Sequence, residues 1–245
     1  MANGLEHVET WVFDLDNTLY PRTCDLFAQV DTLITRYMMD VTGMEMAAAR
    51  RLQKDYYRDH GTTLNGLMLH YDVDPDHYLN SVHDIDYSPV QSHPELVETI
   101  HSLPGKKYIF TNADMGHTEA VLRRLGAWTI FDGMFDIRAA GLVPKPEQYA
   151  YDRFLEKHNI DPKNAVMFDD LEKNLKVPHL LGMATVQVIA AGEFCHSQVE
   201  SWELEQKENE DHVHHITDDL LDFLKSLKFN SHVGGQNGDG ARCSF

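Results

Sequence analysis

Residues 10–19 read TWVFDLDNTL, a short run of β-prone apolar residues that ends in two aspartates, an asparagine and a threonine. A strand buried on both faces of a parallel sheet has this appearance. Similar runs follow as KYIFT at residues 107–111, AVMF at 165–168 and ATVQVI at 184–189. Residues 10–15 therefore predict the first strand of a buried parallel sheet.

Helical patterns separate these runs. Residues 94–102 follow a capping residue at Ser92, and residues 117–125 end at Gly126, which suits the position after a helix. Residues 146–158 carry apolar side chains at helical spacing. Strands and helices that alternate in this way predict an α/β fold with a doubly wound parallel sheet, in which ligands bind beyond the carboxyl ends of the strands.

The alternation is interrupted between the first two strands. Apolar spacing predicts helices over residues 26–41 and 45–59, and Asp74 with Pro75 is typical of the start of a third. One crossover between parallel strands needs far fewer residues, so residues 21–90 are interpreted as an inserted helical subdomain, with ordinary crossover helices as the alternative.

The chain is accordingly divided into three parts. Residues 1–20 and 91–228 are assigned to the α/β core and residues 21–90 to the helical insert. Residues 229–245 are rich in Gly, Asn and Ser and are expected to be a disordered tail.

The predicted strand ends carry the residues suited to chemistry. Asp14 and Asp16 follow the first strand, and carboxylates this close repel one another unless a cation, a proton or hydrogen bonds relieve them. An acidic turn without chemistry is the alternative for this pair alone. Thr111 and Asn112 end the second strand and can donate hydrogen bonds to an anion.

Two further groups of residues suited to chemistry lie in loops next to predicted helices or strands. Lys145 lies between two prolines just before a predicted helix, where its ammonium group can contact a phosphate. Asp169 and Asp170 end the third strand, with Asn174 shortly after, and such oxygen ligands suit Mg²⁺. Each group alone also fits a turn, a solvated lysine or a helix cap. Four such groups in this order favour one shared site.

At this point the sequence resembles a known family. FDLDNTLY, FTNAD, VPKPEQY and FDDLEKN look, in this order, like the four motifs of the haloacid dehalogenase-like hydrolases. Within that superfamily the chain most resembles the pyrimidine 5′-nucleotidases, through DNTLYP and the segment DYYRDHGTTLNGL in the insert.

The resemblance implies a role for each motif residue. Asp14 is expected to be the nucleophile that forms an aspartyl-phosphate, and Asp16 the general acid and base. Thr111 and Lys145 are expected to hold the phosphoryl oxygens. The cofactor implied is Mg²⁺, bound by the carboxylates of Asp14 and Asp170, the backbone carbonyl of Asp16, and Asp169 directly or through water. The remaining assignments are substrate contacts, namely Asn112 in the core and Arg58, His60 and Thr63 in the insert, which is expected to act as a cap.

The second carboxylate favours phosphate esters over halides as substrates. The dehalogenases of the superfamily lack an acid at the position of Asp16, and an alkoxide leaving group needs a proton that a halide does not need. We therefore expect a Mg²⁺-dependent phosphatase for a small metabolite, most closely a pyrimidine nucleoside 5′-monophosphate. The alternatives are a phosphatase for a sugar phosphate or phosphoglycolate, a phosphomutase, and a phosphate-binding regulator without turnover.

Composition restricts the partners. The formal net charge of −18 disfavours binding to nucleic-acid polymers, and no apolar run is long enough to predict a membrane span. The beginning of the chain lacks the pattern of a signal peptide, and Cys24, Cys195 and Cys243 suggest no disulfide framework. These features predict a cytoplasmic protein.

Overall fold

A computed structural model describes residues 4–190 and 211–227 of the chain, so the tail expected at residues 229–245 lies outside the described residues. The core is a six-stranded sheet in the order β3-β2-β1-β4-β5-β6. All neighbouring strands are parallel. The strands are β1 Thr10–Phe13, β2 Lys106–Phe110, β3 Gly133–Phe135, β4 Ala165–Asp169, β5 Ala184–Val188 and β6 His215–Thr217. The predicted α/β class and parallel sheet are confirmed.

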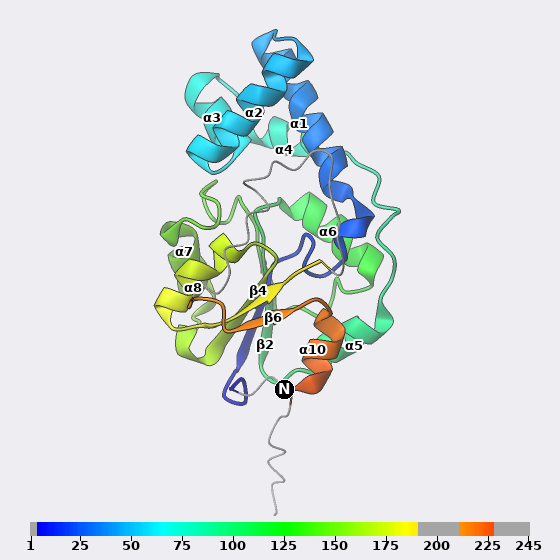
Figure 1. Cartoon of the computed structure of the whole chain (residues 1–245), viewed down its shortest axis with the longest axis vertical. Coiled ribbons are helices and arrows are strands. Elements are labelled where there is room, and N and C mark those ends of the chain that lie inside the picture. The colour runs from blue at the N-terminus through cyan, green and yellow to red at the C-terminus, as the bar shows by residue number, and fades with distance from the viewer. Residues whose placement is uncertain (1–3, 191–210, 228–245) are drawn as a thin grey trace, which may run out of the picture.

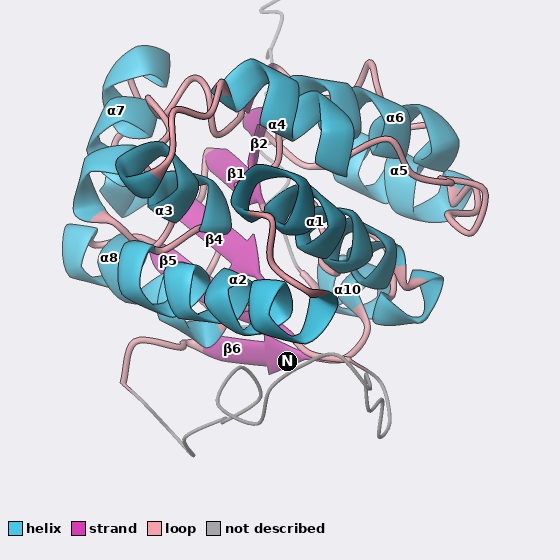
Figure 2. Ribbon diagram, turned by 90° about the horizontal axis from the view of Figure 1, so that it is seen from above, coloured by secondary structure: helices cyan, strands magenta, loops and turns pink. Residues whose placement is uncertain are grey.

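Helices cover both faces of this sheet, as Figures 1 and 2 show. On one face lie α5 Pro94–Ser102, α6 Met115–Leu125 and α10 Leu220–Ser226, and on the other lie α7 Gln148–His158 and α8 Lys176–Leu181. Short 3₁₀ turns occupy Arg22–Cys24, Pro162–Asn164 and Glu172–Leu175.

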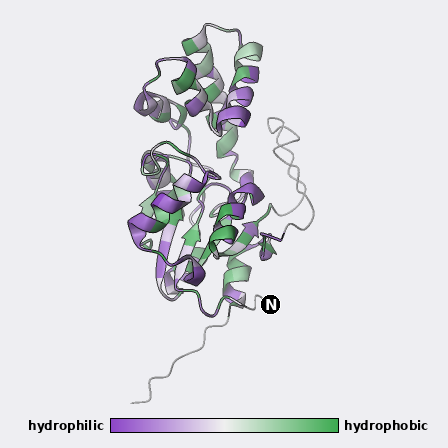
Figure 3. Ribbon diagram, turned by 90° about the vertical axis from the view of Figure 1, so that its left-hand side faces the viewer, coloured by the Kyte–Doolittle hydropathy of each residue, from purple (hydrophilic) through white to green (hydrophobic). Residues whose placement is uncertain are grey.

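Alternation along β1 explains how the two layers form. Trp11 and Phe13 pack into the hydrophobic cluster that includes α5, α6 and α10, whereas Val12 packs into the cluster that includes α7. Successive side chains of a strand point to opposite faces, so a continuous apolar run can serve both layers. In Figure 3 the strands are largely hydrophobic, and hydrophilic residues lie mostly on the helices.

The insert consists of four helices, α1 Leu26–Thr42, α2 Met46–His60, α3 Thr63–His70 and α4 Pro75–Val82. They lie together beyond one end of the sheet (Figure 1). Met38, Tyr56, Leu67 and Tyr78 are among the buried residues of their separate apolar core, which also takes in Ile137 from the loop after β3. Of the two adjacent tyrosines at the end of α2, Tyr56 is the core residue.

Two helices, α3 and α8, and two strands, β3 and β6, were not predicted from the sequence. Helix α3 is capped by Thr62, whose side chain accepts a hydrogen bond from the Asn65 backbone N–H, but the residues of the helix lack an amphipathic pattern. Strands β3 and β6 have only three residues each, too few for an alternating pattern to be read. Shortly before β6, His212 is buried, with Nε2 2.8 Å from Glu172 Oε1.

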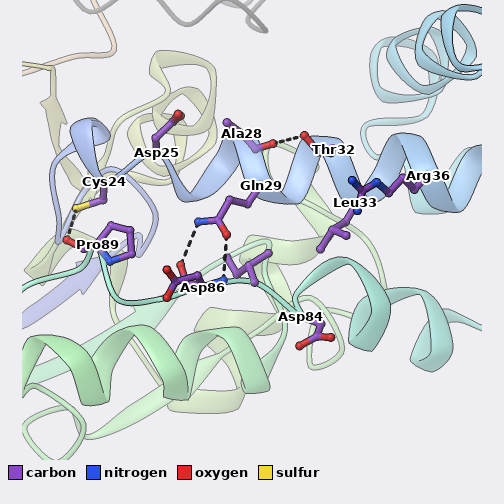
Figure 4. A pocket seen from close by; sticks show the side chains of 11 residues that line it. Cys24, Asp25, Ala28, Gln29, Thr32, Leu33, Arg36, Asp84, Asp86 and Pro89 are labelled. Carbon is purple, nitrogen blue, oxygen red and sulfur yellow. Dashed lines mark hydrogen bonds between the residues drawn. The ribbon is translucent and has the colours of Figure 1, made fainter.

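The two connections between core and insert are held side by side. Gln29 of α1 donates from Nε2 to the backbone carbonyl of Asp86 and accepts from its N–H, both at 3.0 Å, and Cys24 Sγ donates to Pro89 O at 3.5 Å. These contacts border a cavity of about 580 Å³ between the start of α1 and residues 84–89 (Figure 4). This junction fixes how the insert leaves and rejoins the core.

Within residues 4–190 and 211–227, no helix combines the length and the apolar character needed to cross a membrane.

Candidate active site

The carboxyl ends of β1, β2 and β4 bring the predicted site residues together. Phe13 pairs in register with Ile109 of β2 and with Phe168 of β4, so Asp14 lies at the level where both neighbours end. The backbone N–H of Asp14 continues the ladder to Phe168 O at 2.8 Å. Asp169 is the last residue of β4, and Thr111 directly follows β2. One edge of the sheet therefore collects side chains from separate motifs.

Lys145 is at the centre of this edge. Its buried Nζ donates to Asp14 Oδ1 at 2.8 Å, to Asp169 Oδ2 at 2.7 Å and to the backbone carbonyl of Phe110 at 2.9 Å. Burial lowers the pKa of Lys145, but the carboxylates of Asp14 and Asp169 outweigh burial and raise it above its ordinary value. Lys145 is therefore a fixed cation.

Asn112 holds the backbone of Lys145 in place. Its Oδ1 accepts from the Lys145 N–H at 2.8 Å, and its Nδ2 donates to the Lys145 carbonyl at 3.1 Å. The Asn112 amide, which is expected to contact the substrate, thus also positions the Lys145 backbone. Its contact with the substrate stays a prediction. The Thr111 hydroxyl accepts from the Ala113 N–H at 3.0 Å, and the residue is buried.

Three buried carboxylates face one another beside Lys145. Asp14, Asp169 and Asp170 each offer an oxygen, and these atoms lie within 4.8 Å of one another. Burial, partly opposed by Lys145, raises the pKa of Asp14 well above its ordinary value, and Asp169 adds to the increase. Burial and then repulsion by Asp169 raise the pKa of Asp170 to about 7. The cluster holds more negative charge than its surroundings neutralise.

The carboxylates of Asp169 and Asp170 are oriented by hydrogen bonds from neighbouring groups. Asp169 Oδ1 accepts from the Leu171 N–H and from Asn174 Nδ2, both at 2.9 Å. Asp170 Oδ2 accepts from Arg22 Nη2 at 2.8 Å. Lys145 and Arg22 supply two positive charges against three carboxylates. Clustered, buried oxygen donors that lack one positive charge fit a hard divalent cation such as Mg²⁺.

Asp16 lies beside the cluster in a different environment. Its Oδ1 accepts from the Tyr20 hydroxyl at 2.5 Å and contacts His117 Nε2 at 2.7 Å. Burial raises the pKa of Asp16, but attraction to His117 and these hydrogen bonds outweigh burial and lower it below the ordinary value. The pKa values of the two aspartates of the first motif therefore shift in opposite directions, since the pKa of Asp14 is raised and that of Asp16 is lowered.

His117 is held at both ring nitrogens. Tyr87 donates its hydroxyl proton to the His83 carbonyl at 2.9 Å, and the same hydroxyl oxygen lies 3.2 Å from His117 Nδ1. Since that proton is engaged by the carbonyl, Nδ1 must donate to Tyr87, while Nε2 donates to Asp16. Burial lowers the pKa of His117, but Asp16 outweighs burial and raises it, in agreement with donors at both nitrogens.

Sequence reasoning missed Tyr20, Arg22 and His117. Tyr20 and Arg22 closely follow the first motif, and His117 closely follows FTNAD, so nearness to the motifs was the available signal. The sequence alone does not show that His117 contacts Asp16, which lies 101 residues away in the chain.

The expected cap residues have different surroundings. Arg58 is exposed and pairs with Asp55 at 2.9 Å and Asp59 at 2.8 Å. Thr63 is buried in α3, and its hydroxyl donates to the Gln53 carbonyl at 3.2 Å. His60 packs against the rings of Tyr56 and His70. None of these contacts joins Arg58, His60 or Thr63 to the carboxylate cluster, so their role as substrate contacts stays a prediction.

Two other contacts bring the insert close to the site. A Cβ atom added to Gly61, at the turn between α2 and α3, would lie 3.1 Å from Pro144 Cγ, next to Lys145. Lys173 Nζ, shortly after the paired aspartates, donates to the Tyr57 hydroxyl at 3.0 Å. The end of α2 therefore lies over the edge of the sheet that carries the site.

A family model described as haloacid dehalogenase-like hydrolase matches residues 8–177, which include every motif residue of the core site. The chain belongs to the haloacid dehalogenase-like hydrolases. This hydrolase membership confirms the family resemblance found in the four motifs.

Individual proteins are similar to this chain in sequence or in fold. The chain is 26% identical over 207 residues to "Phosphate metabolism protein 8" of Saccharomyces cerevisiae, a match that covers 73% of this chain and spans only 60% of the yeast protein. The HAD phosphatase of Thermococcus onnurineus superposes with a TM-score of 0.57 at 16% identity, over 89% of this chain and 97% of that one. The HAD-hydrolase YfnB of Bacillus subtilis, described as bound to magnesium, superposes with a TM-score of 0.53 at 16% identity, over 89% and 96% of the two chains.

Proposed function

We propose that this hydrolase is a Mg²⁺-dependent phosphatase for a small phosphate monoester. The observation that carries the proposal is the convergence of Asp14, Asp169 and Asp170 beside Lys145, with the separately held Asp16 next to them. This arrangement combines a nucleophile, fixed positive charge for phosphoryl oxygens and an acid–base group, as phosphate ester hydrolysis requires.

We assign the nucleophilic role to Asp14. Its carboxylate is held by Lys145 at Oδ1 and by the Thr18 hydroxyl at Oδ2, 3.3 Å away, so its direction is fixed. Attack on phosphorus forms an aspartyl-phosphate and divides one difficult hydrolysis into two easier steps. Lys145 is placed to offset the repulsion between this carboxylate and the phosphate dianion.

Asp16 is assigned the proton transfers. It gives a proton to the leaving alkoxide in the first step and takes one from the attacking water in the second. An acid at this position favours phosphate esters over the halides that other members of the superfamily use. Thr111, at the end of β2, is assigned to the phosphoryl oxygens together with Lys145.

The metal is assigned to the same carboxylates. Asp14 and Asp170 would hold Mg²⁺ through side-chain oxygens and Asp16 through its backbone carbonyl, with Asp169 as a direct or water-mediated ligand. The bound ion would supply positive charge to the phosphoryl oxygens. The charge deficit of the buried cluster supports this assignment, as does the description of YfnB as bound to magnesium.

The helical insert is assigned the role of a cap that selects the substrate. The end of α2 reaches the site edge through Gly61 and Tyr57, and an enclosing cap favours small metabolites over phosphoproteins. The similarity of residues 55–67 to the pyrimidine 5′-nucleotidases supports a nucleoside 5′-monophosphate as the substrate. Arg58, His60 and Thr63 remain the proposed insert contacts, and the protein is proposed to act in the cytoplasm.

A substrate panel tests this proposal. Phosphate release is measured with UMP, CMP, AMP, IMP, a sugar phosphate and phosphoglycolate, with Mg²⁺ and with EDTA. We expect Mg²⁺-dependent release with the highest kcat/KM for UMP and CMP. Faster release from a sugar phosphate or phosphoglycolate would refute the nucleotide assignment, and no release from any ester would refute the phosphatase.

A further inference from the structure

The two carboxylate oxygens of Asp16 differ in their hydrogen bonds. Both of its hydrogen-bonding partners, Tyr20 and His117, contact Oδ1, at 2.5 Å and 2.7 Å. Among residues 4–190 and 211–227, no hydrogen bond reaches Oδ2. The side chain is 33% exposed, so Oδ2 is the oxygen available to a molecule that enters the site.

The partner His117 is fixed much more firmly than a surface side chain. It is 2% exposed and lies in the first turn of α6, where its backbone N–H donates to the capping Asp114 Oδ1 at 2.9 Å. Its Nδ1 contacts Tyr87, and its ring lies 4.7 Å from the ring of His83. The Nε2 atom that meets Asp16 is therefore held by a helix cap, a hydrogen bond and ring packing.

Tyr20 donates a hydrogen bond to the same oxygen. It is buried, and it lies four residues after Asp16 in the chain, in the segment that leads from β1 to the insert. Two donors on one oxygen restrict rotation of the carboxylate, because rotation would break both bonds at once. The second oxygen then keeps a defined direction.

We propose that His117 and Tyr20 are positioning residues that hold Asp16 so that Oδ2 carries the proton exchanged with the substrate. This inference rests on the proposed phosphatase function. In general, a misplacement of about 1 Å can lower a rate about a hundredfold, so holding the acid in place contributes directly to turnover.

The proton balance agrees with this arrangement. An ester that enters as its monoanion supplies the proton that Asp16 Oδ2 takes up. In the first step the Asp14–phosphorus bond forms, the bond from phosphorus to the ester oxygen breaks, and this proton passes from Oδ2 to that oxygen. In the second step water attacks phosphorus, its proton passes to Oδ2, and the bond from Asp14 to phosphorus breaks. Oδ1 accepts from Tyr20 and His117 throughout, so neither donor moves during the cycle.

The test compares two leaving groups. His117→Ala and Tyr20→Phe are assayed with p-nitrophenyl phosphate, whose leaving group needs little protonation, and with the alkyl phosphate turned over fastest in the substrate panel. We expect kcat/KM, which reports the steps up to departure of the leaving group, to fall about 10- to 100-fold for the alkyl ester and less than about threefold for the aryl ester. His101→Ala, an identical change at an exposed position of α5, should alter neither rate.

Further variants separate positioning from general damage. His117→Gln retains a donor and should recover part of the alkyl-ester rate. In the Asp16→Asn background, His117→Ala should cause little additional loss, because both changes remove the same function. Thermal melting identifies any variant that fails to fold, and Tyr20→Phe keeps the buried ring and carries the test if His117→Ala does not fold.

The outcomes are distinct. Equal loss of kcat/KM on both esters in folded variants, or full additivity with Asp16→Asn, would overturn the inference while leaving the phosphatase in place. No turnover of any ester by the wild-type protein would overturn the proposed function and this inference together.

Discussion

Asp31 of the insert and Asp14 of the core are both buried aspartates, but they are neutralised differently. Asp31 accepts from Arg50 at 2.6 Å and from Gln53 at 2.7 Å, with Lys54 Nζ at 3.3 Å. The single carboxylate of Asp31 therefore contacts two cationic side chains and one amide. Asp14 instead shares Lys145 with Asp169 and lies within 4.8 Å of two other carboxylates.

On this difference we base the proposal that Asp31 has a structural role and Asp14 a functional one. A buried carboxylate surrounded by its own donors stabilises a particular packing, here the contact between α1 and α2. A group of buried carboxylates that exceeds the positive charge around it opposes folding of the protein alone, and is retained where a ligand supplies the missing charge. Burial by itself would not have distinguished the two aspartates.

The largest expected effect is the loss of activity in Asp14→Asn. An amide cannot attack phosphorus, so phosphate release should fall by about 10³-fold or more. Unfolding in denaturant should show no loss of stability, because the change removes one charge from a cluster with excess negative charge. Phosphate release equal to that of the wild type would contradict the assignment of the nucleophile.

The matching change in the insert should show the reverse pattern. Asp31→Asn leaves Arg50 and Lys54 without their shared charge and should lower the free energy of unfolding by about 1–3 kcal/mol. Asp40→Asn, at an exposed position of the same helix, serves as the control and should change stability by less than about 0.5 kcal/mol. If Asp31→Asn abolished turnover in a folded protein, the distinction between the two sites would be wrong.

The smallest expected effect concerns pH and metal. In metal-free protein the pKa of Asp170 is about 7, above the ordinary 3.8, so the folded state keeps a proton that the unfolded state has released. This contribution to stability is fully present at low pH and is lost as pH rises towards about 7.

Melting temperatures at about pH 5 and about pH 7.5 measure this effect. With EDTA the melting temperature should fall between these values, and Asp170→Asn should reduce the fall. Added Mg²⁺ should stabilise the protein most at the higher pH, where no proton competes for the ligand. Identical curves with EDTA and Mg²⁺ would contradict the metal assignment.

The sequence was sufficient for the parts of the molecule whose signal is local. The buried runs predicted four of the strands, and the pairing of these strands places Asp14, Thr111 and Asp169 at the same end of the sheet. Parallel pairing makes this inference possible, because strand ends that are distant in the chain become neighbours in a sheet.

Contacts between distant segments could not be predicted in this way. The bond from His117 to Asp16 depends on how α6 packs, and the bond from Arg22 to Asp170 joins residues 148 positions apart. The insert shows the same limit, since the hydrogen bond from the Thr63 hydroxyl to the Gln53 carbonyl is not visible in the sequence. Side-chain direction within a helix is set by tertiary packing, which a single motif does not encode.

The central claim is that Asp14 carries the phosphoryl group during turnover. It is tested most directly by stopping the reaction of the wild-type protein with its best ester in acid, digesting the protein and analysing the peptide containing Asp14 by mass spectrometry. We predict a phosphoryl group on Asp14 that is absent from Asp14→Asn and from protein treated with EDTA. Steady turnover with no phosphoryl group on that peptide, together with full activity of Asp14→Asn, would contradict the account.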